Sequence, residues 1–273
     1  MTLQNNEIPL TLQQILSRKP NYPKAIVGSG LLFAGTKMIM YGRYKAYKSM
    51  LGLDLAFSLT TGKSWIGFKT PPGGASVLYL QLEIGYELFG SRLRKADAFR
   101  DISKHLIQPL SFWTQHWLKV DQPEGLKLVE HYVEELKPDV VIIDPLYKIV
   151  TGNLLTVLDM QKLVDALDIL IGKFGVSVIL ISHTRKGMMD MGEWGSDDLI
   201  GSFVFSAWAD TIIKVERRGG DRLGVKFDVV RHAEEELEEK EVMFNRDTLE
   251  FTVIEPVMST KEVKEASKEG QTS

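Results

Sequence analysis

The chain has 273 residues, of which 44% are hydrophobic and 25% charged, with a formal net charge of −3. This length allows one large α/β domain or two small ones, and the composition excludes disordered, collagen-like and fibrous proteins. The absence of cysteine excludes a disulfide framework, a cysteine-ligated zinc site and thiol catalysis. With so small a net charge, binding to nucleic acid has to use a local basic patch or a pore.

No apolar run approaches the roughly 18 residues that cross a bilayer. The N-terminal sequence MTLQNNEIPL also lacks a basic region followed by an apolar stretch. We therefore expect a cytoplasmic protein without a membrane partner.

Residues 1–36 are predicted to form an N-terminal arm, with a short helix in LTLQQILSRK followed by an irregular stretch rich in proline and glycine. From residue 37 onward, apolar strands alternate with helices. The expected strands are 37–41, 76–82, 140–144 and 176–182, and the expected helices are 48–60, 86–99, 124–136 and 157–174. Nearly continuous apolar strands separated by helices predict an α/β fold with a doubly wound, mostly parallel sheet.

After residue 210 the pattern changes to strands without helices, in TIIKVERR, LGVKFDVVRH and KEVMFNRDTLEFTVIE. These segments predict two antiparallel hairpins at the edge of the sheet, with an acidic loop at 234–240. The core domain is expected to span 37–256, and 257–273 to form a polar, disordered tail.

The segment GRYKAYKS lies between a predicted strand and a predicted helix, which is the context of a phosphate-binding loop of the pattern GxxxxGK[ST]. In such a loop, backbone N–H groups surround the phosphates, Lys48 neutralises their charge and the Ser49 hydroxyl ligates Mg²⁺. Tyr47 departs from the pattern, because a glycine there would tolerate a positive φ and leave room for the phosphates. The alternative is a lysine-rich turn with solvated Lys45 and Lys48. The candidate nucleotide-binding residues are Gly42, Arg43, Lys45, Ala46, Tyr47, Lys48, Ser49 and Met50.

Three further polar residues end predicted parallel strands, so they are expected at the sheet edge where ligands bind. Asp144 follows the strand VVIID and suits an aspartate that holds Mg²⁺ beside Ser49, although it could simply cap a turn. Glu83 is the candidate general base, or else a first-turn charge of the next helix. His183 could contact the γ-phosphate or the attacking water, or be an ordinary loop residue.

Together these motifs resemble the RecA-like ATPase fold, and specifically the AAA_25 group and the small hexameric helicases of the plasmid RepA type. The resemblance covers about 25–255 and rests on GRYKAYKS, LQLE with Arg92 nine residues later, VVIIDP, ISHTRKG and GS...WAD..IKVER. It implies that Glu83 activates water, that Arg92 packs on the adenine, and that His183 is the strand-end sensor. It also implies a DNA-contacting pore loop in which Arg185 and Lys186 meet phosphates; a mobile surface loop is the alternative.

RecA-like rings place the nucleotide between subunits, so an arginine of a neighbouring subunit must reach the γ-phosphate. Arg231, in DVVRHAEE, matches that position. Many members of the family carry a lysine two residues earlier, where this chain has Val229. Arg217 and Arg218 are weaker candidates, because arginines beside a hairpin turn are often solvated edge charges.

The leading hypothesis is a DNA-dependent ATPase of the replicative-helicase type, using ATP and Mg²⁺, acting on single-stranded DNA and assembling as a homo-hexamer or another ring. The second is a nucleotide-gated factor that assembles on DNA or on a replication or recombination partner with little hydrolysis; the altered loop at Tyr47 favours it. A small-molecule kinase is the third, but it should carry an arginine-rich lid and does not need Glu83.

Overall fold

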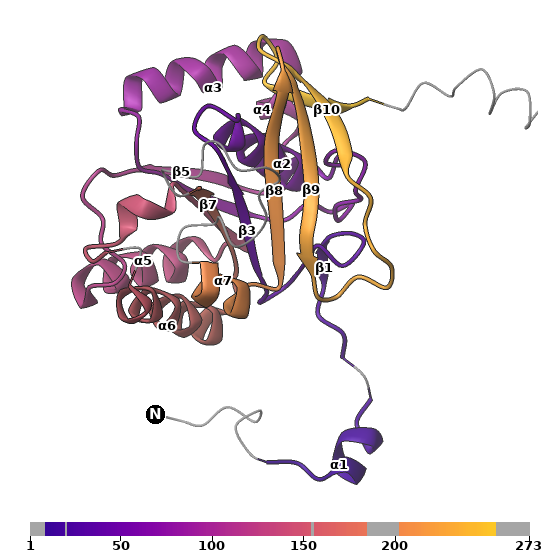
Figure 1. The fold of residues 1–273 in the computed structure, drawn as a ribbon, viewed down its shortest axis with the longest axis vertical. Coiled ribbons are helices and arrows are strands. Elements are labelled where there is room, and N and C mark those ends of the chain that lie inside the picture. Colours follow the sequence, from indigo (N-terminus) through magenta and orange to yellow (C-terminus); the bar gives the residue numbers. More distant parts are fainter. Residues whose placement is uncertain (1–8, 20, 154–155, 185–201, 255–273) are drawn as a thin grey trace, which may run out of the picture.

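The computed structural model describes residues 9–19, 21–153, 156–184 and 202–254. Within these ranges, nine strands form one twisted sheet that runs through the centre of the molecule (Figure 1). In sheet order the strands are β11 (Glu250–Val253), β10 (Lys240–Asn245), β9 (Arg222–Val230), β8 (Thr211–Gly219), β3 (Lys37–Gly42), β7 (Ser177–His183), β6 (Val140–Asp144), β4 (Val77–Gln81) and β5 (Leu110–Thr114). The strands from β8 to β5 are parallel, and those from β9 to β11 are antiparallel to their neighbours.

Helices cover both faces of the parallel part of the sheet, as the alternating pattern predicts. One face packs against α2 (Lys48–Thr61) and α3 (Tyr86–Arg100), and the other against α5 (Pro123–Leu136), α6 (Val157–Phe174) and α7 (Ser202–Trp208) (Figure 1). The central helix α2 is buried along most of its length because it lies between the sheet and the C-terminal strands. Two short segments, α4 (Ile102–His105) and the 3₁₀ helix η1 (Leu146–Ile149), complete this layer structure.

The strand order brings the carboxyl ends of β3, β7, β6 and β4 to one edge of the sheet. Strand β7 lies between β3 and β6, with Gly42 in register with His183. Strand β6 pairs with β4, with Asp144 in register with Gln81. The four chain segments that follow these strands therefore meet at one place, although they are far apart in the sequence.

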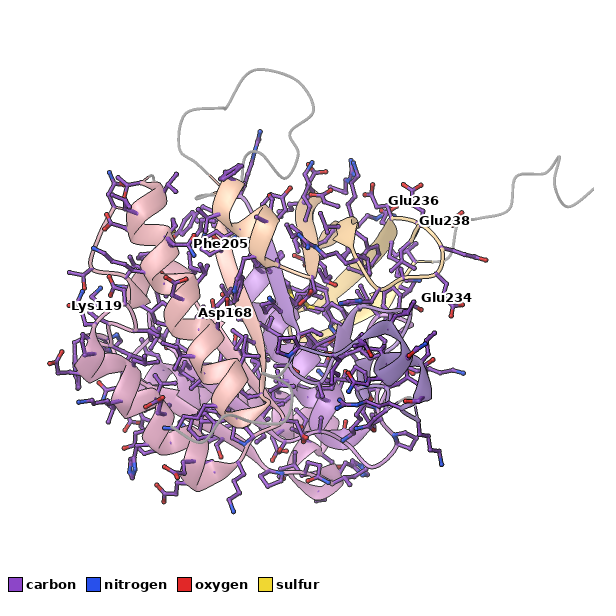
Figure 2. All side chains as sticks on the ribbon, turned by 90° about the horizontal axis from the view of Figure 1, so that it is seen from below. Lys119, Asp168, Phe205, Glu234, Glu236 and Glu238 are labelled. Carbon is purple, nitrogen blue, oxygen red and sulfur yellow. The ribbon has the colours of Figure 1, made fainter. Side chains whose placement is uncertain are left out.

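The C-terminal strands form the expected antiparallel half of the sheet. A tight turn joins β8 to β9 at Gly219 and Gly220, which both have positive φ. The acidic loop between β9 and β10 is observed where it was expected, with Glu234, Glu236 and Glu238 exposed at the periphery of the molecule (Figure 2).

On the face of the sheet that α5, α6 and α7 cover, a hydrogen bond of 2.8 Å from Trp208 Nε1 to Asp168 Oδ1 joins α7 to α6. Phe205 is buried beside them (Figure 2). Lys119 secures the segment before α5, because its Nζ donates to the carbonyl oxygens of Lys148 and Val150 at 2.8 and 2.9 Å. These contacts fasten the helices that support β6 and β7.

The N-terminal segment begins as expected with a short helix, α1 (Leu12–Ser17), which Thr11 and Gln14 cap reciprocally and which buries no residue. The chain joins the core earlier than the expected boundary at residue 36, because β1 (Ala25–Val27) and β2 (Leu32–Phe33) bury Ile26 and Leu32 in it. The predicted tail, 257–273, lies outside the described residues. No helix of the described ranges is long and apolar enough to span a membrane.

Candidate active site

The segment from Gly42 to Ser49 forms a compact loop between β3 and α2. Ala46 N–H donates to the carbonyl of Arg43, and both Lys45 and Tyr47 adopt positive φ, which folds the loop back on itself. A Cβ at Gly42 would lie 2.2 Å from the carbonyl oxygen of Val215, so this position requires glycine. The N–H groups of the first turn of α2 lack acceptors within the helix and can bind an anion.

Lys48 is the central cation of this loop. It is only 4% exposed, and its Nζ donates to the carbonyl oxygen of Arg43 at 2.8 Å. Burial lowers the pKa of Lys48 to about 8, while the negative charges of Asp144 and Glu83 act in the opposite direction. A buried ammonium group at a helix N-terminus is a fitting partner for a phosphate.

His183 extends from the end of β7 toward Lys48, with 3.2 Å between His183 Nδ1 and Lys48 Nζ. An ammonium group can only donate, so Nδ1 is the acceptor and the neutral ring carries its proton on Nε2. Burial, followed by the charge of Lys48, lowers the pKa of His183 to about 4. The ring is therefore neutral at physiological pH.

Ser49 and Asp144 are joined directly: Ser49 Oγ donates to Asp144 Oδ1 at 2.9 Å. Tyr79 of β4 donates to the other carboxylate oxygen at 2.8 Å. Asp144 is 4% exposed, and its burial raises its pKa to about 6. A hydroxyl and a carboxylate oxygen at this separation are hard ligands of the kind that Mg²⁺ prefers.

Glu83 lies just beyond the end of β4 and is exposed, unlike Asp144. Its Oε1 accepts a hydrogen bond of 2.5 Å from the hydroxyl of Tyr147, a residue of η1. Burial and this hydrogen bond raise the pKa of Tyr147, so the phenol remains a donor. The charge of Glu83 acts on Lys48, Asp144 and His183, which places the carboxylate in the same electrostatic cluster.

A phosphate loop, a buried lysine, a serine–aspartate pair and an exposed glutamate thus share one sheet edge. The sequence matches the family model described as an AAA domain (AAA_25) over residues 6–189, which is more than half of the chain. The chain belongs to this family. Its members are P-loop ATPases, so this AAA domain protein is a nucleotide-dependent ATPase with the mixed α/β fold expected of it. A search of curated proteins found no match.

The AAA domain accommodates Tyr47 by directing its side chain away from the loop. Tyr47 has φ 57° and ψ 20°, a left-handed conformation that costs a bulky residue about 1–3 kcal/mol. Its ring packs 4.7 Å from that of Phe244, and its hydroxyl donates to Asp221 Oδ1 at 3.0 Å. The side chain therefore lies against the C-terminal hairpins, and it does not pack over Lys48.

Of the remaining predicted residues that the structure describes, Met50 and Arg92 lie near this cluster, whereas Arg231 lies far from it. Arg92 is half-buried on α3, and its charge partly opposes the rise that burial causes in the pKa of Tyr79. Arg231 follows β9 at the opposite edge of the sheet, where its Nη2 donates to the carbonyls of Ser206 and Ala207 at 3.0 and 2.9 Å. Met50 is half-buried in the first turn of α2. Arg185 and Lys186 lie outside the described residues.

Two tyrosines of the site were not expected from the sequence. Tyr79 was assigned only to a strand, and Tyr147 was assigned no role. Because alternate residues of a strand face the same side, Tyr79 could have been placed on the same face as Gln81, but this does not reveal its contact with Asp144. The position of Tyr147 depends on η1, a short helix that no sequence pattern indicated.

Proposed function

We propose that the protein is a DNA-dependent ATPase of the ring-forming replicative-helicase type, using ATP and Mg²⁺. The observation that best supports this is the contact between His183 and Lys48. It joins the phosphate loop to the end of β7, and the segment that follows β7 carries Arg185 and Lys186. A change at the phosphates could pass through His183 to a basic segment suited to single-stranded DNA.

The residues of the site divide the work of hydrolysis among them. The loop N–H groups and Lys48 bind the phosphates, and Ser49 and Asp144 are suited to hold Mg²⁺. Bound Mg²⁺ would neutralise negative charge on the phosphate oxygens. Glu83 is exposed where it can orient and deprotonate a water molecule, and the neutral imidazole of His183 is free to donate from Nε2.

A ring explains why Arg231 is far from the phosphate loop of its own chain. At the opposite sheet edge it would face a neighbouring subunit's nucleotide, where an arginine stabilises transition-state charge. In mixtures of Arg231→Ala and Glu83→Gln subunits, each subunit supplies what the other lacks, so we expect partial recovery of ATPase activity. Mixtures no more active than the separate variants would contradict a shared site.

The test of the proposal is steady-state ATP hydrolysis with and without single-stranded DNA, together with ATP binding in the same buffer. We expect binding without DNA and stimulation of turnover by DNA. Double-stranded DNA and single-stranded RNA of equal length serve as controls for the preferred nucleic acid. An enzyme whose turnover no nucleic acid alters would contradict DNA dependence.

A second candidate is a nucleotide-gated assembly factor with little hydrolysis. Its support is the 2.5 Å hydrogen bond from Tyr147 to Glu83, because an engaged carboxylate is a weaker base. Tyr147→Phe distinguishes the two candidates. Faster hydrolysis by this variant would favour a restrained enzyme, whereas tight binding with negligible turnover in both forms would favour the assembly factor.

A further inference from the structure

Tyr47, Asp221 and Arg246 form a connected group at the tips of the two C-terminal hairpins, which we name the hairpin clamp. The Tyr47 hydroxyl donates to Asp221 Oδ1 at 3.0 Å and accepts from Arg246 Nη2 at 2.7 Å. Arg246 Nε also donates to Asp221 Oδ2 at 2.9 Å, which closes the triangle. The clamp therefore joins the phosphate loop to the β8–β9 turn and to the β10–β11 turn.

The clamp is more than a way of accommodating a large side chain. A left-handed conformation in a bulky residue persists only where the surroundings hold it, and glycine would adopt it without any contacts. Tyr47 is held on several sides: Phe244 packs against the ring at 4.7 Å, and the guanidinium of Arg217 lies 5.1 Å from its centroid. Its backbone is thus fixed from the C-terminal half of the protein.

Tyr47 immediately precedes Lys48 and is the N-cap of α2. A displacement of its backbone would move the Lys48 ammonium group and the first N–H groups of the helix together. We propose that the hairpin clamp positions the phosphate loop, so that the two hairpin turns set the affinity for nucleotide. By linkage, bound nucleotide must stabilise the clamp in return. This inference rests on the proposed binding of ATP by the loop.

The experiment is to measure the dissociation constant for ATP in wild-type protein, Tyr47→Phe, Tyr47→Gly, Arg246→Ala and the Tyr47→Phe/Arg246→Ala double variant. We expect each single variant to bind about fivefold more weakly, as for the loss of one hydrogen bond. The double variant should bind scarcely more weakly than either single one, because both substitutions remove the hydrogen bond between Arg246 and the Tyr47 hydroxyl and open the same clamp. The Tyr47→Gly variant is the sharpest test, since it restores the glycine of the motif and is nevertheless expected to bind less well.

The matched control is Arg222→Ala, which removes an exposed arginine of the β8–β9 hairpin that lies next to Asp221 and 3.6 Å from Glu241. We expect it to bind ATP as the wild type does. Unfolding midpoints without nucleotide separate positioning from folding, since a clamp variant should lose affinity at a nearly unchanged midpoint. ATP should also slow hydrogen exchange in the 219–222 turn of the wild type but not of Tyr47→Phe.

Wild-type affinity in both Tyr47→Gly and Arg246→Ala would overturn the clamp while leaving ATP binding intact. Equal binding of ATP by Lys48→Ala and the wild type, or no binding by either, would instead overturn the proposed function and the clamp with it. With Lys48→Ala measured beside the clamp variants, the two failures therefore give different patterns of affinity.

Discussion

The two halves of the sheet treat charge in different ways. At the carboxyl edge of the parallel half, Lys48 and Asp144 are almost fully buried. Burial lowers the pKa of Lys48 and raises the pKa of Asp144. In the antiparallel half, several charged residues form pairs near the surface, such as Arg218 with Glu239 and Arg246 with Asp221, although Lys214 of β8 is buried beside Glu216. The buried charged groups are suited to bind a charged ligand, whereas the exposed ones are already neutralised by their ion-pair partners.

This difference predicts where substitutions matter. Removing a buried charge at the parallel edge should change binding or catalysis strongly, because no water can replace it. Removing an exposed paired charge should change little, because solvent screens the interaction and takes its place. Two exposed features are expected exceptions. Glu83 would act directly on the attacking water if it is the general base, and the exposed pair of the hairpin clamp holds a strained residue of the buried site.

The largest effect is expected for Glu83→Gln. If Glu83 is the general base, turnover should fall about 1,000-fold while ATP affinity stays within a few-fold of the wild type. Single-turnover hydrolysis and equilibrium binding measure the two quantities. The control is Glu87→Gln, which removes an exposed acid of the first turn of α3 and should leave turnover unchanged. Equal losses in both variants would contradict the role of Glu83.

Lys48→Ala should weaken ATP binding about 100-fold, because it removes a charge-assisted contact in a buried setting. Titration calorimetry checks the value. Lys63→Ala, at an exposed position just beyond the C-terminal end of α2, is the control and should bind ATP as the wild type does. If both variants bind alike, the buried lysine does not contact the phosphates.

A third prediction concerns the buried Asp54 of α2, which lies between the two halves of the sheet. Arg100 donates to Asp54 at 2.8 Å and to the Leu249 carbonyl at 3.3 Å. Burial raises the pKa of Asp54 to about 7. Between about pH 4 and pH 7 the folded chain keeps a proton that the unfolded chain has released, so stability falls as pH rises through that range. The pKa of about 7 already includes the opposing charge of Arg100, and its difference from the usual value near 4 corresponds to a fall of roughly 3 kcal/mol between pH 4 and pH 7.

Urea unfolding at several pH values measures this dependence. The Asp54→Asn variant should lack the part of the pH dependence that Asp54 causes. The exposed Asp165→Asn on α6 is the control and should follow the wild-type curve. A parallel course for wild type and Asp54→Asn between pH 4 and pH 7 would show that Asp54 is ionised throughout.

The smallest effect is expected for Arg218→Ala in the antiparallel half. Its guanidinium pairs with Glu216 and Glu239, but its side chain is 47% exposed. We expect a loss of less than about 1 kcal/mol in the free energy of unfolding and no change in ATP affinity. A loss of stability as large as that from removing a buried charge would contradict the expected difference between exposed and buried charges in the two halves.

Much of the fold was predictable because its strands are apolar and its helices regular. The strand predicted before the phosphate loop agrees closely with β3, and the helix predicted after it agrees closely with α2. Strand β5 was missed because LSFWT is short, only partly buried and lacks alternation. Strands β1 and β2 were missed because they are too short for a pattern and depend on contacts such as that from Gly28 N–H to the Lys69 carbonyl.

The site was predictable only as far as strand ends determine it. Ser49, Asp144 and His183 were expected at one edge because parallel strands end there, and the contacts of Ser49 with Asp144 and of His183 with Lys48 agree with this. The direction of the Tyr47 side chain was not predictable, since its partner Asp221 lies 174 residues later in the chain. Neither was the hydrogen bond from Tyr147 to Glu83, which depends on the local geometry of η1. The roles of Arg92, Arg231, Arg185 and Lys186 stay predictions.

The close approach of Gly42 to the Val215 carbonyl also affects how inactive variants are interpreted. Gly42 is the first residue of the phosphate loop, so a loss of activity in Gly42→Ala would ordinarily be ascribed to poor phosphate binding. Here the added methyl group would collide with the backbone of β8 and separate the two strands. An inactive variant at this position would show that the pairing of β3 with β8 is disrupted, and it would therefore provide no information about nucleotide recognition.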